Sequence, residues 1–101
     1  MDNIIVRPGI ELVEIKGVYL LVADREARKQ CRYIQRINDV GATIWNALKS
    51  GADLNKLCEL IRKEYEMPDD YDLIADIISF IDNLKQYRYV IYGDVDTELK
   101  V

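Results

Sequence analysis

The sequence of 101 residues predicts one α+β domain, in which a sheet of short strands is followed by three helices. Two patterns predict this fold class. Apolar residues recur at a spacing of two in the first third of the chain, which is typical of strands, and at helical spacing further on. The composition, 50% apolar and 32% charged, suits a single compact core rather than a disordered chain.

Three strands are expected before the first helix. The segments IELVEI (Ile10 to Ile15) and VYLLVA (Val18 to Ala23) alternate or run apolar, and the pair Lys16-Gly17 between them suggests a tight hairpin. The charged segment DREARKQ, Asp24 to Gln30, is expected to be a long solvated connection that could hold a short helical turn. A third strand should then begin at Cys31.

The third strand has mixed faces. Side chains alternate along a strand, so one face carries Cys31, Tyr33, Gln35 and Ile37, and the other carries Arg32, Ile34 and Arg36. Such a strand suits the edge of a sheet, where unpaired N–H and C=O groups can receive another extended chain. The arginines have two open interpretations: they discourage unwanted edge pairing, or they attract the carboxylates of an acidic peptide.

Each helix has a recognisable start. Asn38 fits the N-cap of a helix through Trp45, and Gly51 is expected to close that helix in the left-handed conformation. Asp53 can cap a second helix. Pro68 and the aspartates after it favour the start of a third helix. The apolar positions of that third helix are Leu73, Ile74, Ile77, Ile78, Phe80, Ile81 and Leu84.

The third helix is more apolar than one contact stripe requires, because its apolar positions span an arc of roughly 160°. Either it sits in the middle of a small core, or one margin stays open as a groove. The run YRYVIY, Tyr87 to Tyr92, could extend this helix, but a strand or an extended end is favoured. We therefore predict a domain over residues 1–92 and a loose tail over residues 93–101.

Composition excludes several classes of function. The chain has no histidine, so Ser–His or Cys–His nucleophiles and imidazole metal ligands are unavailable. Its two cysteines, Cys31 and Cys58, lack the spacing of a zinc site or a disulfide framework. The net charge of −4 disfavours nucleic acid, and no segment has the roughly 20 apolar residues of a membrane span. We expect a cytoplasmic, non-catalytic protein with no cofactor and no metal.

The stretch RINDVGATIW, Arg36 to Trp45, resembles the strand-to-helix junction of the small PqqD-like proteins, also called RiPP recognition elements. The resemblance runs from about Pro8 to Ile91 and includes RPGIEL, LKSGADLNKLCELI, EYEMPDDYDLIADI and the spacing to LKQYRYVI. Two features depart from the family. The family often has a glycine after the third helix, where this chain reads Tyr87, Arg88 and Tyr89, and the DREARKQ connection is longer and more charged than usual.

This resemblance implies a winged helix-turn-helix-like domain of three antiparallel strands followed by three helices. It also implies that the leader segment of a ribosomally made precursor peptide adds as a fourth strand beside the third strand, against the third helix. The peptide-binding residues would be Arg32, Tyr33, Ile34, Gln35 and Arg36 on the strand and Leu73, Ile74, Ile77 and Ile81 on the helix. Periodicity leaves open which of the helix residues line the groove and which fill the core.

Three functions can be weighed from the sequence. The leading hypothesis is a chaperone that captures the leader and presents the precursor to a separate modifying enzyme, which in this family is a radical SAM enzyme, a cyclase or a protease. The alternative is a winged-helix DNA-binding regulator, but the third helix carries Asp72, Asp76 and Asp82 where groove-reading side chains would be needed. An enzyme is disfavoured because the carboxylates are accounted for by helix caps and solvated faces.

Overall fold

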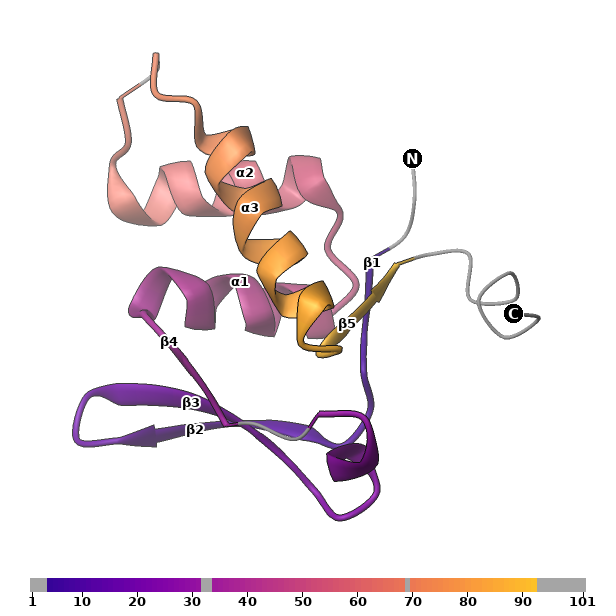
Figure 1. Cartoon of the computed structure of the whole chain (residues 1–101). Coiled ribbons are helices and arrows are strands. Elements are labelled where there is room, and N and C mark those ends of the chain that lie inside the picture. The colour runs from indigo at the N-terminus through magenta and orange to yellow at the C-terminus, as the bar shows by residue number, and fades with distance from the viewer. Residues whose placement is uncertain (1–3, 32–33, 69, 93–101) are drawn as a thin grey trace.

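A computed structural model describes residues 4–31, 34–68 and 70–92. Its main sheet is antiparallel, with the strand order β2-β3-β4. Strand β2 (Ile10–Ile15) pairs with β3 (Val18–Ala23), and β3 pairs with β4 (Gln35–Ile37). The three helices lie together on one side of this sheet (Figure 1). The predicted α+β class, a three-stranded antiparallel sheet followed by three helices, is confirmed.

A second, two-stranded sheet joins the two ends of the described chain. Strand β1 (Ile4–Val6) pairs antiparallel with β5 (Val90–Tyr92). The strand predicted after the third helix is therefore present, whereas β1 was not anticipated. The pairing continues one step beyond β1, because the N–H of Arg7 donates to the carbonyl of Tyr89 at 2.9 Å.

Each α-helix is preceded by an N-cap residue whose side chain accepts a hydrogen bond from a backbone N–H group of the first turn. Helix α1 (Asp39–Lys49) has Asn38 as its N-cap, and α2 (Leu54–Tyr65) has Asp53. Gly51, with φ of 90°, follows α1 in the predicted left-handed conformation. Helix α3 (Leu73–Gln86) is capped by Asp72, which lies later than the start expected at Pro68 to Asp70. None of these helices, within the described part of the chain, is long and apolar enough to span a bilayer.

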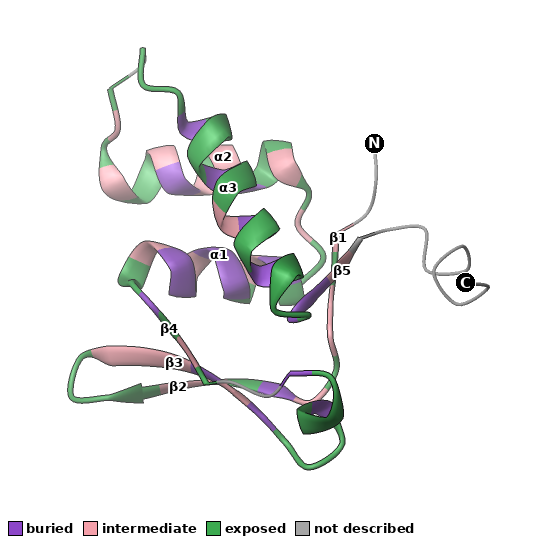
Figure 2. Ribbon diagram, in the orientation of Figure 1, coloured by how far each residue is buried: buried purple, intermediate pink, exposed green. Residues whose placement is uncertain are grey.

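The core lies between the sheet and the helices, where Figure 2 shows the buried residues. Trp45 of α1 is 0% exposed, and Leu21 of β3 and Leu57 and Ile61 of α2 are equally buried. Helix α3 contributes four side chains to the same cluster: Leu73, Ile77, Ile81 and Leu84. Helix α3 therefore takes part in the core, as the first of the two alternatives describes, while Ile74 and Ile78 stay exposed.

Two local predictions are corrected or refined, and a third is not tested. The third strand is shorter than expected: β4 starts at Gln35, and Cys31 lies before it. The charged connection is not wholly solvated, because it contains a single turn of 3₁₀ helix, Ala27–Lys29, whose Ala27 is buried. That turn was the alternative offered for this segment. The predicted tail, residues 93–101, lies outside the described residues.

The end of α3 shows how the chain replaces the glycine of the family pattern. Arg88 has φ of 69°, so a non-glycine residue takes the left-handed position. Its N–H donates to the carbonyl of Lys85, and the N–H of Tyr89 donates to that of Leu84, both at 2.9 Å. This pair of bonds closes a helix in the same way as a glycine would. It turns the chain back so that Tyr89 is fully buried and β5 can reach β1.

The fully buried Trp45 should dominate the stability of the domain. We expect Trp45→Ala to lower the free energy of unfolding by roughly 3–5 kcal/mol, because truncating a buried aromatic side chain leaves a cavity. The indole N–H has no hydrogen-bond partner among the described residues, so Trp45→Phe should cost clearly less. Urea titration of the two variants measures this difference, and equal losses for both would contradict it.

Candidate functional site

Strand β4 is an edge strand of three residues. Among the described strands it pairs with β3 alone, in the register Tyr19 to Ile37, Leu20 to Arg36 and Leu21 to Gln35. Its other side is open to an additional strand as far as the described residues reach. Arg32 and Tyr33, which the sequence predicts to be part of this strand, lie outside the described residues.

The hairpin between β2 and β3 determines which backbone groups of β4 face outward. Lys16 and Gly17 both have positive φ, 51° and 81°, as a two-residue type I′ turn requires. The closing pair of such a turn, here Ile15 and Val18, exchanges hydrogen bonds, and bonded pairs then alternate along the strands. Leu20 therefore bonds to β2, and its partner Arg36 directs its N–H and C=O away from β3.

Asn38 joins β4 directly to α1. Its backbone is extended, and its side chain accepts a hydrogen bond from the N–H of Gly41 at 2.7 Å. The chain therefore changes from strand to helix within one residue. A Cβ at position 41 would lie 3.0 Å from the ring of Phe80, so the glycine allows α3 to approach the first turn of α1 closely.

A groove of about 390 Å³ separates the open strand from α3. We call it the β4–α3 groove. It is lined by Gln35, Arg36 and Ile37 of β4, by Asn38, and by Ser79, Phe80, Asn83 and Leu84 of α3. The lining combines apolar side chains with side-chain amides and one hydroxyl. An extended peptide lying along β4 would have one of its faces in this groove.

A smaller pocket of about 250 Å³ opens beside the groove, between α1 and α3. Phe80 lines both spaces. The pocket is mostly apolar, with Val40 and Ile44 of α1 opposite Leu73 and Ile77 of α3, and with Met67 at its side. It is large enough for one apolar side chain of a guest.

Asp76 places a carboxylate at the α1–α3 pocket. The hydroxyl of Tyr71 donates a hydrogen bond to this carboxylate. That bond raises the pKa of the Tyr71 hydroxyl above its ordinary value, because the hydroxyl must keep its proton to donate it. The negative charge of Asp76 raises this pKa further, because it disfavours a negative phenolate nearby. The rim of the pocket is therefore polar, whereas its floor is aliphatic.

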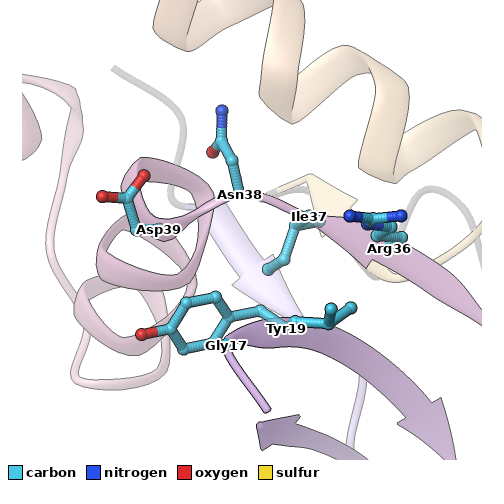
Figure 3. A pocket seen from close by; sticks show the side chains of 7 residues that line it. Gly17, Tyr19, Arg36, Ile37, Asn38 and Asp39 are labelled. Carbon is cyan, nitrogen blue, oxygen red and sulfur yellow. The ribbon is translucent and has the colours of Figure 1, made fainter. Parts of the chain in front are cut away.

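A third hollow, of about 710 Å³, lies at the hairpin end of the sheet. Figure 3 shows the Tyr19 ring below Ile37, with Asp39 and Arg36 at opposite sides. Arg36 thus borders both this hollow and the β4–α3 groove. A cation at this position would attract acidic side chains toward the open edge of the sheet.

The structure brings only some of the predicted peptide-binding residues together. Gln35 and Arg36 line the groove, and Ile34, just before β4, is 64% exposed. Leu73 and Ile77 are 2% and 1% exposed and form the floor of the α1–α3 pocket. Ile81 is buried at 2% and belongs to the core cluster. Contact of these residues with a peptide stays a prediction.

Ile74 is exposed on a side of α3 other than the side that lines the β4–α3 groove. It lies nine residues before Asn83, which is two and a half helical turns, so the two side chains point in opposite directions. Ile78 is likewise exposed and rotated away from Phe80. The open apolar margin that the sequence suggested therefore exists, but it is not the margin that borders β4.

Sequence reasoning missed the α3 residues that do face the groove. Ser79, Phe80 and Asn83 line the groove, and Asp76 lines the adjoining α1–α3 pocket. The four positions follow the spacing i, i+3, i+4 and i+7 from Asp76, which puts them on one helical face. This stripe is mixed in polarity, so a search for apolar residues passes over it. The signal that could have found it is a polar stripe directly beside the apolar arc.

The segment that leads into β4 is held by the end of α3. The carbonyl of Arg88 accepts from Arg7 Nε at 2.6 Å and from the Cys31 thiol at 3.1 Å. Burial raises the pKa of the Cys31 thiol, against a smaller opposing effect of Arg7. Burial also raises the pKa of the Tyr89 hydroxyl, although a hydrogen bond from the Gln35 backbone opposes the rise. These contacts hold the chain on both sides of residues 32–33.

Two comparisons with known proteins give a match. Residues 27–90, more than half of the chain, match the protein family described as coenzyme PQQ synthesis protein D (PqqD). Among solved structures, a chain described as lasso peptide synthetase B1 complexed with the leader peptide has a TM-score of 0.69 and 21% sequence identity. That match covers 88% of this chain and 98% of the other chain. No curated protein matches the sequence.

The Asn38 cap should stabilise both α1 and the end of β4. We expect Asn38→Ala to lower the free energy of unfolding by about 1 kcal/mol, as is usual for an N-cap. Asp53→Ala is the matched control, because Asp53 accepts from the Lys56 N–H at 2.9 Å in a helix outside the groove. Hydrogen exchange should quicken around residues 35–41 only in Asn38→Ala. The same quickening in the control would contradict a special role for this junction.

Proposed function

The chain belongs to the PqqD family, and on this premise we propose that it is a non-catalytic adaptor for a peptide. A segment of the peptide adds as a strand to β4 and lies in the β4–α3 groove. The rest of the peptide stays free for a separate modifying enzyme. The observation that carries this proposal is the open side of β4, whose Arg36 N–H and C=O face a groove rather than another described strand.

The groove is needed for affinity. Each backbone hydrogen bond of an added strand contributes about 0.5–1.5 kcal/mol net, whereas association costs roughly 4–15 kcal/mol. A three-residue edge therefore cannot hold a peptide by strand addition alone. Apolar side chains of the guest, at about 1.5–3 kcal/mol each when fully buried, supply the difference. Phe80 and the floor of the α1–α3 pocket offer the surfaces that such side chains would cover.

We propose that the guest is the leader segment of a ribosomally made precursor peptide. The structure of similar fold is described as complexed with a leader peptide, which supports this class of guest. The family resemblance of the RINDVGATIW junction supports it independently. An acidic leader would be favoured, because Arg36 stands at the open edge and would attract carboxylates as the peptide approaches.

Presentation to an enzyme follows from tethering. Once the leader is bound, the remaining part of the precursor is held at a high effective concentration near any enzyme that associates with the adaptor. The modifying enzyme is then a radical SAM enzyme, a cyclase or a protease, the classes that the family resemblance implies. No residue of the described groove needs to take part in bond making.

Strand addition can be tested at the outward-facing N–H of Arg36. Arg36→Pro removes this donor while leaving the bonds to β3, so the fold should survive at an edge position. We expect affinity for the leader to fall about tenfold relative to Arg36→Ala, which loses only the side chain. Calorimetry with a synthetic leader from a short precursor encoded beside this chain measures both. Equal affinities for the two variants would place the peptide elsewhere.

The role of the groove can be tested at Phe80. Phe80→Ala should weaken binding of the same peptide by roughly tenfold or more, because the ring lines both the groove and the pocket. Ile78→Ala is the matched control, since Ile78 is 42% exposed on another side of α3. Fluorescence anisotropy of the labelled peptide reports both affinities. A greater loss in the control would assign the guest to the opposite margin of α3.

A further inference from the structure

The face of the main sheet that points away from the helices is mostly aliphatic. Side chains alternate along each strand, and Leu21 and Ile37 point into the core. Their neighbours along the strands must then point to the other face, which none of α1, α2 and α3 covers in Figure 1. The aliphatic side chains of this outward face are Val13 and Ile15 of β2, Val18, Leu20 and Val22 of β3, and Ile34 just before β4.

These six residues form a continuous patch. Val13 pairs with Leu20, and Ile15 pairs with Val18, so the side chains lie in neighbouring rows across the sheet. Ile15 is 54% exposed and Ile34 is 64% exposed, and the other four are half-buried. None of the six is packed against the main core cluster. Contiguous exposed aliphatic surface of this kind usually marks an interface.

Two opposite charges flank the patch. Glu11 lies on β2 and Arg36 on β4, so they stand on opposite edge strands of the same face. Both are exposed. Within the part of the chain that the structure describes, neither side chain has a salt-bridge partner. The face therefore carries a cation on one side, an anion on the other and an aliphatic centre.

We propose that a second copy of this chain packs on the outward face, sheet against sheet, about a two-fold axis. In such a contact, residue i of the first copy meets residue j of the second copy, and residue j of the first copy meets residue i of the second. The face is complementary to itself, because Glu11 of each copy can meet Arg36 of the other while the aliphatic centres cover one another. Two ion pairs then arise from one pair of residues.

The charges favour a second copy over an unrelated protein, because a second copy carries the complementary pair of charges at the required positions.

The size of the face sets the strength of the contact. Eight side chains on three short strands offer only a few hundred Å² per copy, which is below the roughly 800 Å² of a standard interface. The dimer is therefore weak and concentration-dependent. It does not rest on the proposed peptide binding, because the in-plane edge of β4 stays open.

Sedimentation velocity of the full chain, from micromolar to millimolar concentration, tests the dimer. We expect the mean mass to rise toward twice that of the monomer. Leu20→Glu, which places a charge in the centre of the patch, should weaken association at least about tenfold. Ile78→Glu puts the same charge on an exposed aliphatic residue of α3 and should leave association unchanged. A wild-type chain that stays monomeric throughout overturns the proposal and leaves the face to another protein.

A charge exchange tests the pairing itself and changes exposed residues only, so folding is not at risk. Glu11→Arg and Arg36→Glu should each weaken self-association, because like charges then meet at both contacts. An equimolar mixture of the two variants should restore association, because opposite charges then meet at both contacts of the mixed dimer. A mixture that associates no better than either variant alone overturns the proposed stacking, whatever the two variants do to peptide binding.

Discussion

The hydrogen bond from the Gly41 N–H to the Asn38 side chain is the constraint on which the candidate site depends. This bond ends β4 and starts α1 at the same residue. No loop separates the two elements, so the position of the open strand relative to α1 is fixed. Gly41 in turn admits the ring of Phe80, which sets how closely α3 approaches. The start of α1 therefore fixes the distance between the strand edge and α3.

An open strand beside a partly apolar groove is a hazard as well as a site, because any extended chain can pair with it. Two features limit this hazard. Strand β4 has three residues, so it offers few backbone bonds. Its groove is lined partly by Gln35, Ser79 and Asn83, which water can solvate when the groove is empty. Selective binding then requires a guest that satisfies both the polar lining and the apolar pocket, which a random strand does not.

Local chemistry was predictable from the sequence, whereas the mutual placement of the elements was not. Asn38 and Asp53 act as N-caps because a short side chain suffices, whatever surrounds it. Strand β1, which was not predicted, has three residues, too few to show a period, and only its pairing with β5 makes it a strand. The wide apolar arc of α3 indicated that more than one element packs against this helix. The width of the arc does not tell which of its margins borders the groove. Ile74, a predicted peptide-binding residue, lies away from the groove, whereas Phe80, which lines the groove, was counted only in the apolar arc.

Arg36 links the two proposed interactions through different atoms. Its N–H and C=O lie in the plane of the sheet and face an added strand, whereas its side chain borders the outward face. A guest strand and a second copy can therefore occupy their sites together as far as the backbone is concerned. They compete only for the guanidinium, when an acidic guest residue and the Glu11 of the second copy both approach it. Coupling of this kind is reciprocal, so an acidic leader would loosen the dimer by the same factor by which the dimer weakens the leader.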